Sequence, residues 1–324
     1  MRLCRYIHNK QTHVGLYDDL TITPLAVAAQ AYADATHDKA KLPAGGDLLP
    51  FLPPDGEFFA YAKKAAEFAS RNAGMLAAAR VQSNNVELLV PIARPNKLLL
   101  LAGNYNEHIT EGGGKATERA ETFPYVFMKP PTTTLVDPLK PVVIPKVSPD
   151  HTDWELELGV VIGKTARHVT EADALGYVAG YTVCNDISDR VFRPNPSRKE
   201  RPNDKWFDWE HGKWHDSFCP CGPCIASADA IPDPQKLAMK LTVSGNLKQN
   251  ATTAQQIFSV AAVVAFISDI VTLEPGDIIS TGTPAGVGHA TKTYLKPGDR
   301  MEAWIEGIGT LVSPVVAEGE LRAR

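Results

Sequence analysis

Hydrophobic and polar residues alternate in two short segments at the start of the chain. RLCRYI and THVGLYDD have this period of two, and the four residues HNKQ lie between them. The pattern predicts two strands joined by a turn. Two alanine-rich segments follow, 24–39 and 55–80, and Pro24 stands where proline favours the first turn of a helix. We therefore expect the chain to begin with a small α/β unit.

After residue 96 the pattern changes to short β-branched runs separated by turn residues. Pro91 and Pro95 mark a linker, so we expect a small N-terminal domain over 1–95 and a larger domain over 96–324. One helix is expected over 252–271, ending at LEPGD. The elements do not alternate regularly between strand and helix, which favours the α+β class. The predicted strands are KLLLLAG, YVFMK, PVVIP, ELELGVVIG, GYVAGYTVCNDIS, KLTVSG, DIISTG, MEAWIEG and TLVSPVVAEG.

Composition narrows the class of protein. The 324 residues carry a net charge of −4, so the chain lacks the basic excess that nucleic-acid binding requires. VAAVVAFI, near residue 260, is the longest apolar run and is too short to span a bilayer. The first residues lack the apolar stretch of a signal peptide. We expect a cytoplasmic protein that binds neither nucleic acid nor membrane.

Three of the five cysteines lie in CPCGPC, at 219–224. Its second half, Cys-Gly-Pro-Cys, has the sequence of a redox-active cysteine pair, and the complete segment resembles part of a zinc site. A redox pair needs a helix after its first cysteine, and Pro232 and Pro234 leave little room for one. A zinc site needs a fourth ligand at matched spacing, which we do not find. We expect reduced thiols beside a Gly-Pro turn.

HTDWELELGVVIGK, at 151–164, carries the chemistry that stands out most. On a strand, Glu155 and Glu157 point to one face, while Leu156, Leu158 and Val160 point to the other. Adjacent carboxylates repel each other, and a divalent cation would relieve the repulsion. The alternative is an ordinary solvated strand face.

A third carboxylate, Asp186, ends the apolar segment GYTVCNDISDR. Three carboxylates form an all-oxygen set that suits Mg²⁺, Mn²⁺ or Ca²⁺ rather than zinc. In GNYNEHITEGG, His108 and Glu111 are three residues apart, so one helical turn would place them on the same face. Such a pair could activate a water; the alternative is a surface histidine on a polar loop.

Together these segments resemble the fumarylacetoacetate hydrolase (FAH) family over nearly all of 97–318. The resemblance rests on DWELELGVVIGK, GYTVCNDISDR, GKWHDSFCPCGP, LEPGDIISTGTPAGVG and LKPGDRMEAWIEGIGTL, in this order. It implies a mixed β-sandwich roll as the catalytic domain, a homodimer, and bound Mg²⁺ or Mn²⁺. In this pattern the residues at the cysteine positions are mostly apolar, which again favours structural thiols.

The resemblance also implies roles for individual residues. The metal ligands would be Glu155, Glu157 and Asp186. His108 and Glu111 match the His-x-x-Glu dyad of the branch that cleaves acylpyruvates, where the dyad lies on a lid. The remaining matches are the catalytic-site lysines Lys129 and Lys213 and the substrate-binding residues Tyr105, Arg190, Gly282 and Thr283.

The implied activity is metal-dependent hydrolysis of a C–C bond in a 1,3-dicarbonyl 2-oxo acid, through a metal-stabilised enolate and a water activated by the dyad. Two alternatives remain: a lyase of the same fold (an oxaloacetate-type decarboxylase or a 2-keto-3-deoxy sugar acid dehydratase) and a non-enzymatic binding protein. The sequence departs from the family where a glutamine often follows the metal Asp, since Arg193 stands at that place. The aromatic and charged insertion at 193–213 could belong to the lid or to a dimer contact.

Overall fold

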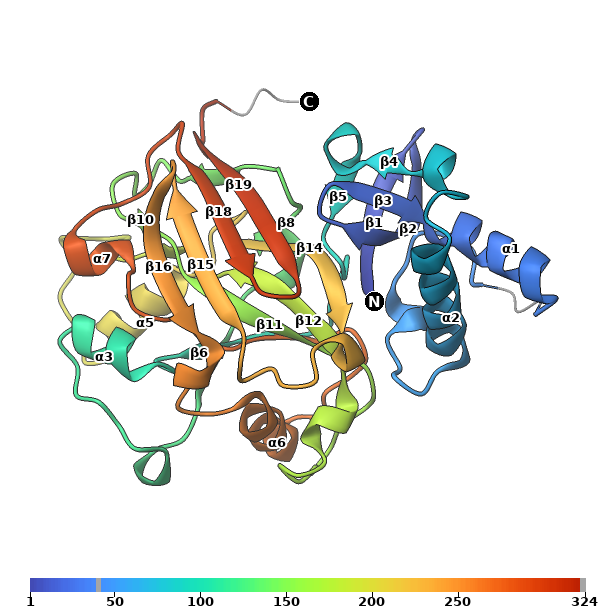
Figure 1. The fold of residues 1–324 in the computed structure, drawn as a ribbon. Helices are drawn as coiled ribbons and strands as arrows, with labels where there is room; N and C mark the ends of the chain where they lie inside the picture. Colours follow the sequence, from blue (N-terminus) through green and yellow to red (C-terminus); the bar gives the residue numbers. More distant parts are fainter. Residues whose placement is uncertain (39–41, 321–324) are drawn as a thin grey trace.

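The computed structural model describes residues 1–38 and 42–320 (Figure 1). Its helices are α1 Leu25–Thr36, α2 Glu57–Arg71, α3 Asn106–Glu111, α4 Pro131–Thr134, α5 Asp204–His211, α6 Val260–Ile270 and α7 Gly288–Thr291. Its strands are β1 Arg2–His8, β2 Gln11–Asp18, β3 Thr21–Pro24, β4 Val81–Gln82, β5 Glu87–Leu89, β6 Leu98–Ala102, β7 Tyr125–Met128, β8 Leu135–Val136, β9 Val142–Ile144, β10 Thr152–Asp153, β11 Leu156–Ile162, β12 Val178–Asn185, β13 Ser188–Asp189, β14 Cys219–Ser227, β15 Ala238–Val243, β16 Asn246–Thr252, β17 Ile278–Ser280, β18 Arg300–Ile305 and β19 Gly309–Ala317.

A twelve-stranded mixed sheet runs through the molecule. Ten of its strands follow the path β4-β3-β2-β1-β14-β12-β11-β17-β6-β7, while β5 pairs with β1 and β8 pairs with β14. Its first strands form the predicted hairpin, and Asn9 and Lys10 both take the positive φ values that a tight hairpin turn requires. β1 also pairs antiparallel with β14, so the N-terminal strands extend the sheet that carries β11 and β12. The domain boundary at 95/96 stays a prediction.

A second sheet, β16-β15-β18-β19-β9, lies over β11 and β12 (Figure 1). The even-numbered residues of β11 pack against it in one large apolar core with α6. The opposite face of the large sheet contributes Val161 and Leu100 to a second core, which α1 and α2 help to form. The α+β sandwich expected from the sequence is confirmed. Every helix in the described ranges falls short of the length and hydrophobicity of a membrane span.

All nine strands predicted after the linker are present, but three other boundaries differ from the prediction. The helix predicted over 55–80 ends at Arg71, because Asn72 and Gly74 favour turns. The helix predicted from 252 begins at Val260, with Ser259 as its N-cap. The helix predicted over 24–39 ends at Thr36, and residue 39 lies outside the described residues.

The CPCGPC segment is not a turn. Residues 219–224 belong to β14, a fully buried strand between β1 and β12. All five cysteines are buried and reduced. No helix follows Cys221, so the spelling of a redox pair has no structural counterpart here. Pairing with two neighbouring strands outweighs the local turn preference of Gly222 and Pro223.

Candidate metal centre and active site

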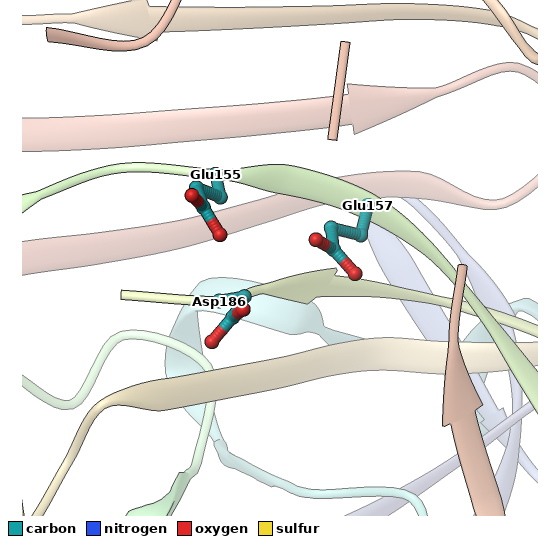
Figure 2. Close-up of side chains that lie close together, drawn as sticks. All are labelled: Glu155, Glu157 and Asp186. Carbon is teal, nitrogen blue, oxygen red and sulfur yellow. The ribbon is translucent and has the colours of Figure 1, made fainter. Parts of the chain in front are cut away.

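Glu155, Glu157 and Asp186 meet where β11 begins and β12 ends (Figure 2). One carboxylate oxygen of each lies within 4.8 Å of the others. We call these three residues the carboxylate centre. Their backbones are joined directly, since Asp186 N donates to Glu155 O at 2.9 Å. Glu155 N also donates to Asn185 Oδ1 at 2.9 Å. The register of two paired strands therefore brings residues 31 positions apart onto one site.

The expectation of a solvated strand face is wrong. Glu155 is 4% exposed and Glu157 is 1% exposed. The predicted alternation is right about direction but incomplete, because β11 is buried on both faces and begins at Leu156, one residue after Glu155. Burying carboxylates is costly unless opposite charges compensate them.

Three cationic side chains compensate one side of the carboxylate centre. Lys213 Nζ donates to Glu155 Oε2 at 2.7 Å and to Asp186 Oδ2 at 2.6 Å. Arg190 Nη2 lies 2.6 Å from Glu155 Oε1, and Lys129 forms an ion pair with Asp186. Burial opposes the charge of Glu155, but Arg190 and Lys213 lower its pKa below the usual range. Burial likewise opposes the charge of Lys213, yet Asp186 and Glu155 raise its pKa.

Glu157 has a different environment. Its Oε2 accepts from Ser280 Oγ at 2.6 Å and from Gly282 N at 2.9 Å. Its Oε1 is buried and has no hydrogen-bond partner among the described residues. Burial and the charges of Asp186 and Glu155 raise the pKa of Glu157 well above its ordinary value. Unlike Glu155 and Asp186, Glu157 forms no ion pair with a basic side chain of the described residues.

The residues present fit a divalent cation. Buried carboxylate oxygens are hard donors of the kind that Mg²⁺ and Mn²⁺ prefer. Glu157 Oε1 has no hydrogen-bond partner among the described residues, and Glu157 lies beside two carboxylates of like charge, so a bound cation would satisfy it. In residues 1–38 and 42–320 this is the one cluster of histidine, cysteine or acidic side chains with that geometry.

His108 and Glu111, the dyad that the family resemblance implies, lie in contact on α3. His108 Nδ1 lies 2.8 Å from Glu111 Oε1, and both side chains are 19% exposed. Glu111 Oε2 accepts from Gly286 N at 2.9 Å, which ties α3 to the glycine-rich loop 281–288. Gly286 has φ +103°, and a Cβ there would lie 2.2 Å from Lys248 O, so only glycine allows this approach.

The other predicted residues lie in the same region but use their polar atoms in different ways. Thr283 Oγ1 donates to Leu156 O at 3.0 Å, at the start of β11. Gly282 offers its N–H to Glu157. Tyr105 is the N-cap of α3, and its hydroxyl lies in the core, 3.4 Å from Met239 Sδ. A role of Tyr105 in substrate binding stays a prediction.

Three polar residues of the site were not singled out from the sequence. Ser280 binds Glu157. Gln249 donates to Thr283 Oγ1 at 2.8 Å and accepts from Leu156 N at 3.0 Å. Asp153 binds Arg190. Only Asp153 had a signal, because it continues the alternation of Glu155 and Glu157 by one step towards the N-terminus.

This fold and site define a class: β-sandwich proteins with a buried cluster of carboxylates that fits a divalent cation, together with a His–Glu pair on α3. The family model described as fumarylacetoacetate (FAA) hydrolase C-terminal matches residues 97–316. The chain belongs to the FAH family and is an enzyme of that family.

Two curated relatives and one solved structure illustrate the range of the family. The chain is 43% identical over 224 residues to a 2,4-didehydro-3-deoxy-L-rhamnonate hydrolase of Sphingomonas sp. (strain SKA58), covering 68% of this chain and 73% of the relative. It is 38% identical over 235 residues to oxaloacetate tautomerase fahd2, mitochondrial, of Xenopus laevis, covering 72% and 69%. The maleylpyruvate hydrolase from Sphingobium sp. SYK-6, solved with manganese(II) and pyruvate, has a TM-score of 0.71 and 30% identity, covering 98% of this chain and 99% of that one.

Proposed function

We propose that this enzyme hydrolyses a C–C bond in a 1,3-dicarbonyl 2-oxo acid of the acylpyruvate kind. The observation that carries the proposal is the pairing of two features: a carboxylate centre suited to a divalent cation, and a His–Glu dyad with a 2.8 Å contact. A hydrolase of this chemistry requires both features, because the cation would stabilise an enolate and the dyad would activate water.

The names of two relatives support this substrate class. A 2,4-didehydro-3-deoxy acid and a maleylpyruvate both have oxo groups at carbons 2 and 4. Each is therefore a 2-oxo acid with a second carbonyl two carbons away. We propose the same 2,4-dioxo acid core for the substrate of this enzyme, with Mg²⁺ or Mn²⁺ as the cation.

Binding of such a substrate follows from the charges in the site. When bound, the cation supplies Lewis-acid stabilisation of negative charge on the carboxylate and 2-oxo oxygens of the substrate. Glu155, Glu157 and Asp186 would hold it. Arg190 and Lys213 would place positive charge near the carboxylate and 2-oxo oxygens of the substrate. The backbone of the loop at Gly282 and Thr283 would let the substrate carboxylate approach closely.

The dyad would handle the water. Glu111 is fixed at both oxygens, by His108 and by Gly286 N, so it holds the imidazole in one orientation. His108 Nε2 then takes a proton from water, whose oxygen attacks carbon 4 of the substrate. The bond between carbons 3 and 4 breaks, and its electron pair passes to carbon 3 as the enolate of pyruvate. Lys129 and Lys213 offset the negative charge, and a proton returns to carbon 3.

A tautomerase is the second candidate, favoured by the 38% identity to an oxaloacetate tautomerase. Moving a proton between carbon and oxygen needs the enolate but not an activated water. The decarboxylase and dehydratase alternatives share this requirement, although the relatives reported above are named as hydrolases or tautomerases. We propose hydrolysis first because the dyad has no necessary place in the other reactions.

The experiment compares wild type with His108→Ala in the presence of Mn²⁺. Acylpyruvates, oxaloacetate and keto-deoxy sugar acids are assayed, together with exchange of the carbon-3 protons of pyruvate for deuterium. We expect His108→Ala to lose about 100-fold or more in hydrolysis and to keep the deuterium exchange. His168→Ala is the matched control, since His168 forms a similar but exposed pair with Asp269.

The outcomes separate the candidates. Cleavage of an acylpyruvate by wild type at a rate that His108→Ala retains would overturn the role of the dyad. Interconversion of oxaloacetate tautomers without cleavage of any acylpyruvate would replace the first candidate by the second. If none of these reactions occurs and Mn²⁺ does not bind, the hypothesis of a non-enzymatic binding protein would be favoured.

Two further parts of the proposal concern the whole molecule. We propose a homodimer in the cytoplasm, acting on a small-molecule 2-oxo acid. The insertion supplies α5, whose Trp209 packs on Phe127 with ring centroids 4.9 Å apart. Trp206 and Phe207 of the same helix are 55% and 45% exposed. These exposed rings favour a dimer contact for the outer face of α5.

A further inference from the structure

Asp153 is a fully buried acidic residue beside the carboxylate centre that the proposed reaction does not use. It ends β10 and lies two residues before Glu155. Its exposed fraction is 0%. A buried carboxylate in an enzyme site is a ligand, an acid–base group or a support for another side chain, and its contacts distinguish these roles.

Both oxygens of Asp153 are fully occupied by donors from this chain. Oδ1 accepts from Trp154 N at 2.8 Å and from Gly288 N at 2.7 Å. Oδ2 accepts from His289 N at 2.9 Å and from Arg190 Nε at 2.8 Å. Four hydrogen bonds use the acceptor capacity of a carboxylate. Asp153 therefore differs from Glu157, whose Oε1 is unpartnered, and does not fit as a fourth metal ligand.

The contacts of Asp153 converge on Arg190. The guanidinium group is planar; its Nε donates a hydrogen bond to Asp153, and its Nη2 forms an ion pair with Glu155. Contacts at these two atoms fix the plane of the group. The Arg190 side chain remains 12% exposed, so it is held in place but still reachable.

The same carboxylate fixes the start of α7, after the glycine-rich loop. Gly288 comes so close that a Cβ there would lie 2.6 Å from Asp153 Oδ1 and 1.9 Å from Thr293 O. The sequence thus permits the short contact only with glycine at 288. Asp153 joins two segments of the site that are 98 residues apart, Arg190 and Gly288.

We propose that Asp153 is a positioning residue, which aims Arg190 at the negative charge of a bound 2-oxo acid. The inference rests on the proposed function in one respect, since it takes Arg190 as a substrate-binding residue. It predicts that Asp153 contributes to anion binding only through Arg190.

A double-mutant cycle tests this with oxalate as the probe. The dissociation constant of oxalate is measured by calorimetry with Mn²⁺-loaded wild type, Asp153→Asn, Arg190→Met and the double variant. We expect each single change to weaken oxalate binding about tenfold or more, because a charge-assisted hydrogen bond is lost or misdirected. Adding Asp153→Asn to Arg190→Met should change it by less than about twofold.

Asp277→Asn is the matched control. Asp277 is also fully buried; it accepts from two backbone N–H groups, against three for Asp153, and likewise pairs with one cation, Lys97. Its removal should lower thermal stability and leave oxalate affinity unchanged. The inference is overturned if Asp153→Asn weakens binding equally in both backgrounds, or if either single variant binds oxalate as wild type does.

A second measurement needs no variant of Asp153. In protein with ¹⁵N-labelled arginine, Arg190→Lys identifies the Nε–H signal of Arg190, and wild type should protect this proton from exchange with solvent. Exchange as fast as that of the exposed Arg71 would overturn the inference. Oxalate binding requires no turnover, so failure to cleave acylpyruvates would refute the proposed reaction and leave this test intact.

Discussion

Two groups of buried side chains, both of residue types that can ligate metal ions, lie side by side on neighbouring strands. One is the carboxylate centre, and the other is a thiol cluster of Cys184, Cys219 and Cys221. In the sheet register Glu157 stands opposite Cys184, and Cys184 stands opposite Cys221. The two groups thus share strands, depth and sheet face, but their electrostatic surroundings differ.

The carboxylate centre is charged and incompletely satisfied. Lysine and arginine surround Glu155 and Asp186, while Glu157 Oε1 has no partner. In the thiol cluster, the contact with Cys219 lowers the pKa of Cys184, but the contact with Cys221 and burial outweigh it and raise this pKa well above its ordinary value. Cys184 Sγ lies 3.8 Å from Cys221 Sγ, and the contact with Cys184 together with burial raises the pKa of Cys219 well above its ordinary value. Thiols bind metals as thiolates, so burial favours the carboxylates as the functional group and the thiols as core.

The largest expected effect is that of Glu157→Gln. Glutamine keeps the shape and the hydrogen bond from Ser280 but removes the charge that would hold a cation. We expect kcat/KM to fall by about 1,000-fold or more, since the cation carries most of the enolate stabilisation. The shift in melting temperature with Mn²⁺ should disappear as well.

The protein without metal should not lose stability in Glu157→Gln, because the substitution removes repulsion from Asp186 and Glu155. Melting curves with EDTA and with Mn²⁺ measure both effects. A variant that still responds to Mn²⁺ as wild type does would show that Glu157 is not a ligand.

The next effect is that of Lys213→Met, which removes compensating charge from the carboxylate centre. Breaking a buried ion pair from one side costs about 3–5 kcal/mol, and we expect this loss of unfolding free energy in EDTA. Mn²⁺ should restore more stability to Lys213→Met than to wild type, because it replaces the missing positive charge.

Lys97→Met is the control for this comparison. Lys97 also pairs with a buried aspartate, Asp277, but at a place without a metal site. The Lys97→Met variant should be less stable than wild type, and Mn²⁺ should stabilise it no more than it stabilises wild type. Equal stabilisation of the two lysine variants by Mn²⁺ would contradict the difference in charge between the carboxylate centre and the rest of the core.

Cys221→Ala should have a smaller effect and tests the other side of the comparison. Removing a buried sulfur leaves a small cavity and costs about 1 kcal/mol. Activity and the response to Mn²⁺ should stay within about twofold of wild type, because the thiol contributes packing rather than charge. Loss of the Mn²⁺ response would mean that the two clusters act as one unit. Steady-state kinetics and melting curves measure these quantities.

The sequence predicted the carboxylate centre better than its surroundings. Alternation along β11 and the end of an apolar segment at Asp186 are local signals, and together they nominate the three carboxylates that the structure brings together. The strand containing CPCGPC was missed because Gly222 and Pro223 favour a turn locally, and only pairing with β8 and β12 makes the segment a strand.

The contacts that compensate the buried charges also could not be predicted from local sequence patterns. Lys213 reaches Glu155 across 58 positions, and Asp153 reaches Gly288 across 135. Such pairs have no periodicity in the sequence, since they depend on how the two sheets and the loops assemble. Resemblance to a family could nominate Lys213 and Arg190, but not the carboxylates that each one contacts.

The smallest expected effect concerns alkaline pH and the thiols alone. Burial raises the pKa of Cys224 from its ordinary value of 9.0 to about 12. In the unfolded chain this thiol ionises near 9.0, whereas in the folded protein it stays protonated. Its contribution to stability is therefore complete below pH 9.0 and is lost as the pH rises from 9.0 towards 12.

Urea unfolding between pH 8 and pH 10.5 measures this loss. The free energy of unfolding should decline less steeply with pH for Cys224→Ala than for wild type. Equal slopes for wild type and Cys224→Ala would mean that this thiol already ionises in the folded protein, and the contrast between charged carboxylates and neutral thiols would then not extend to Cys224.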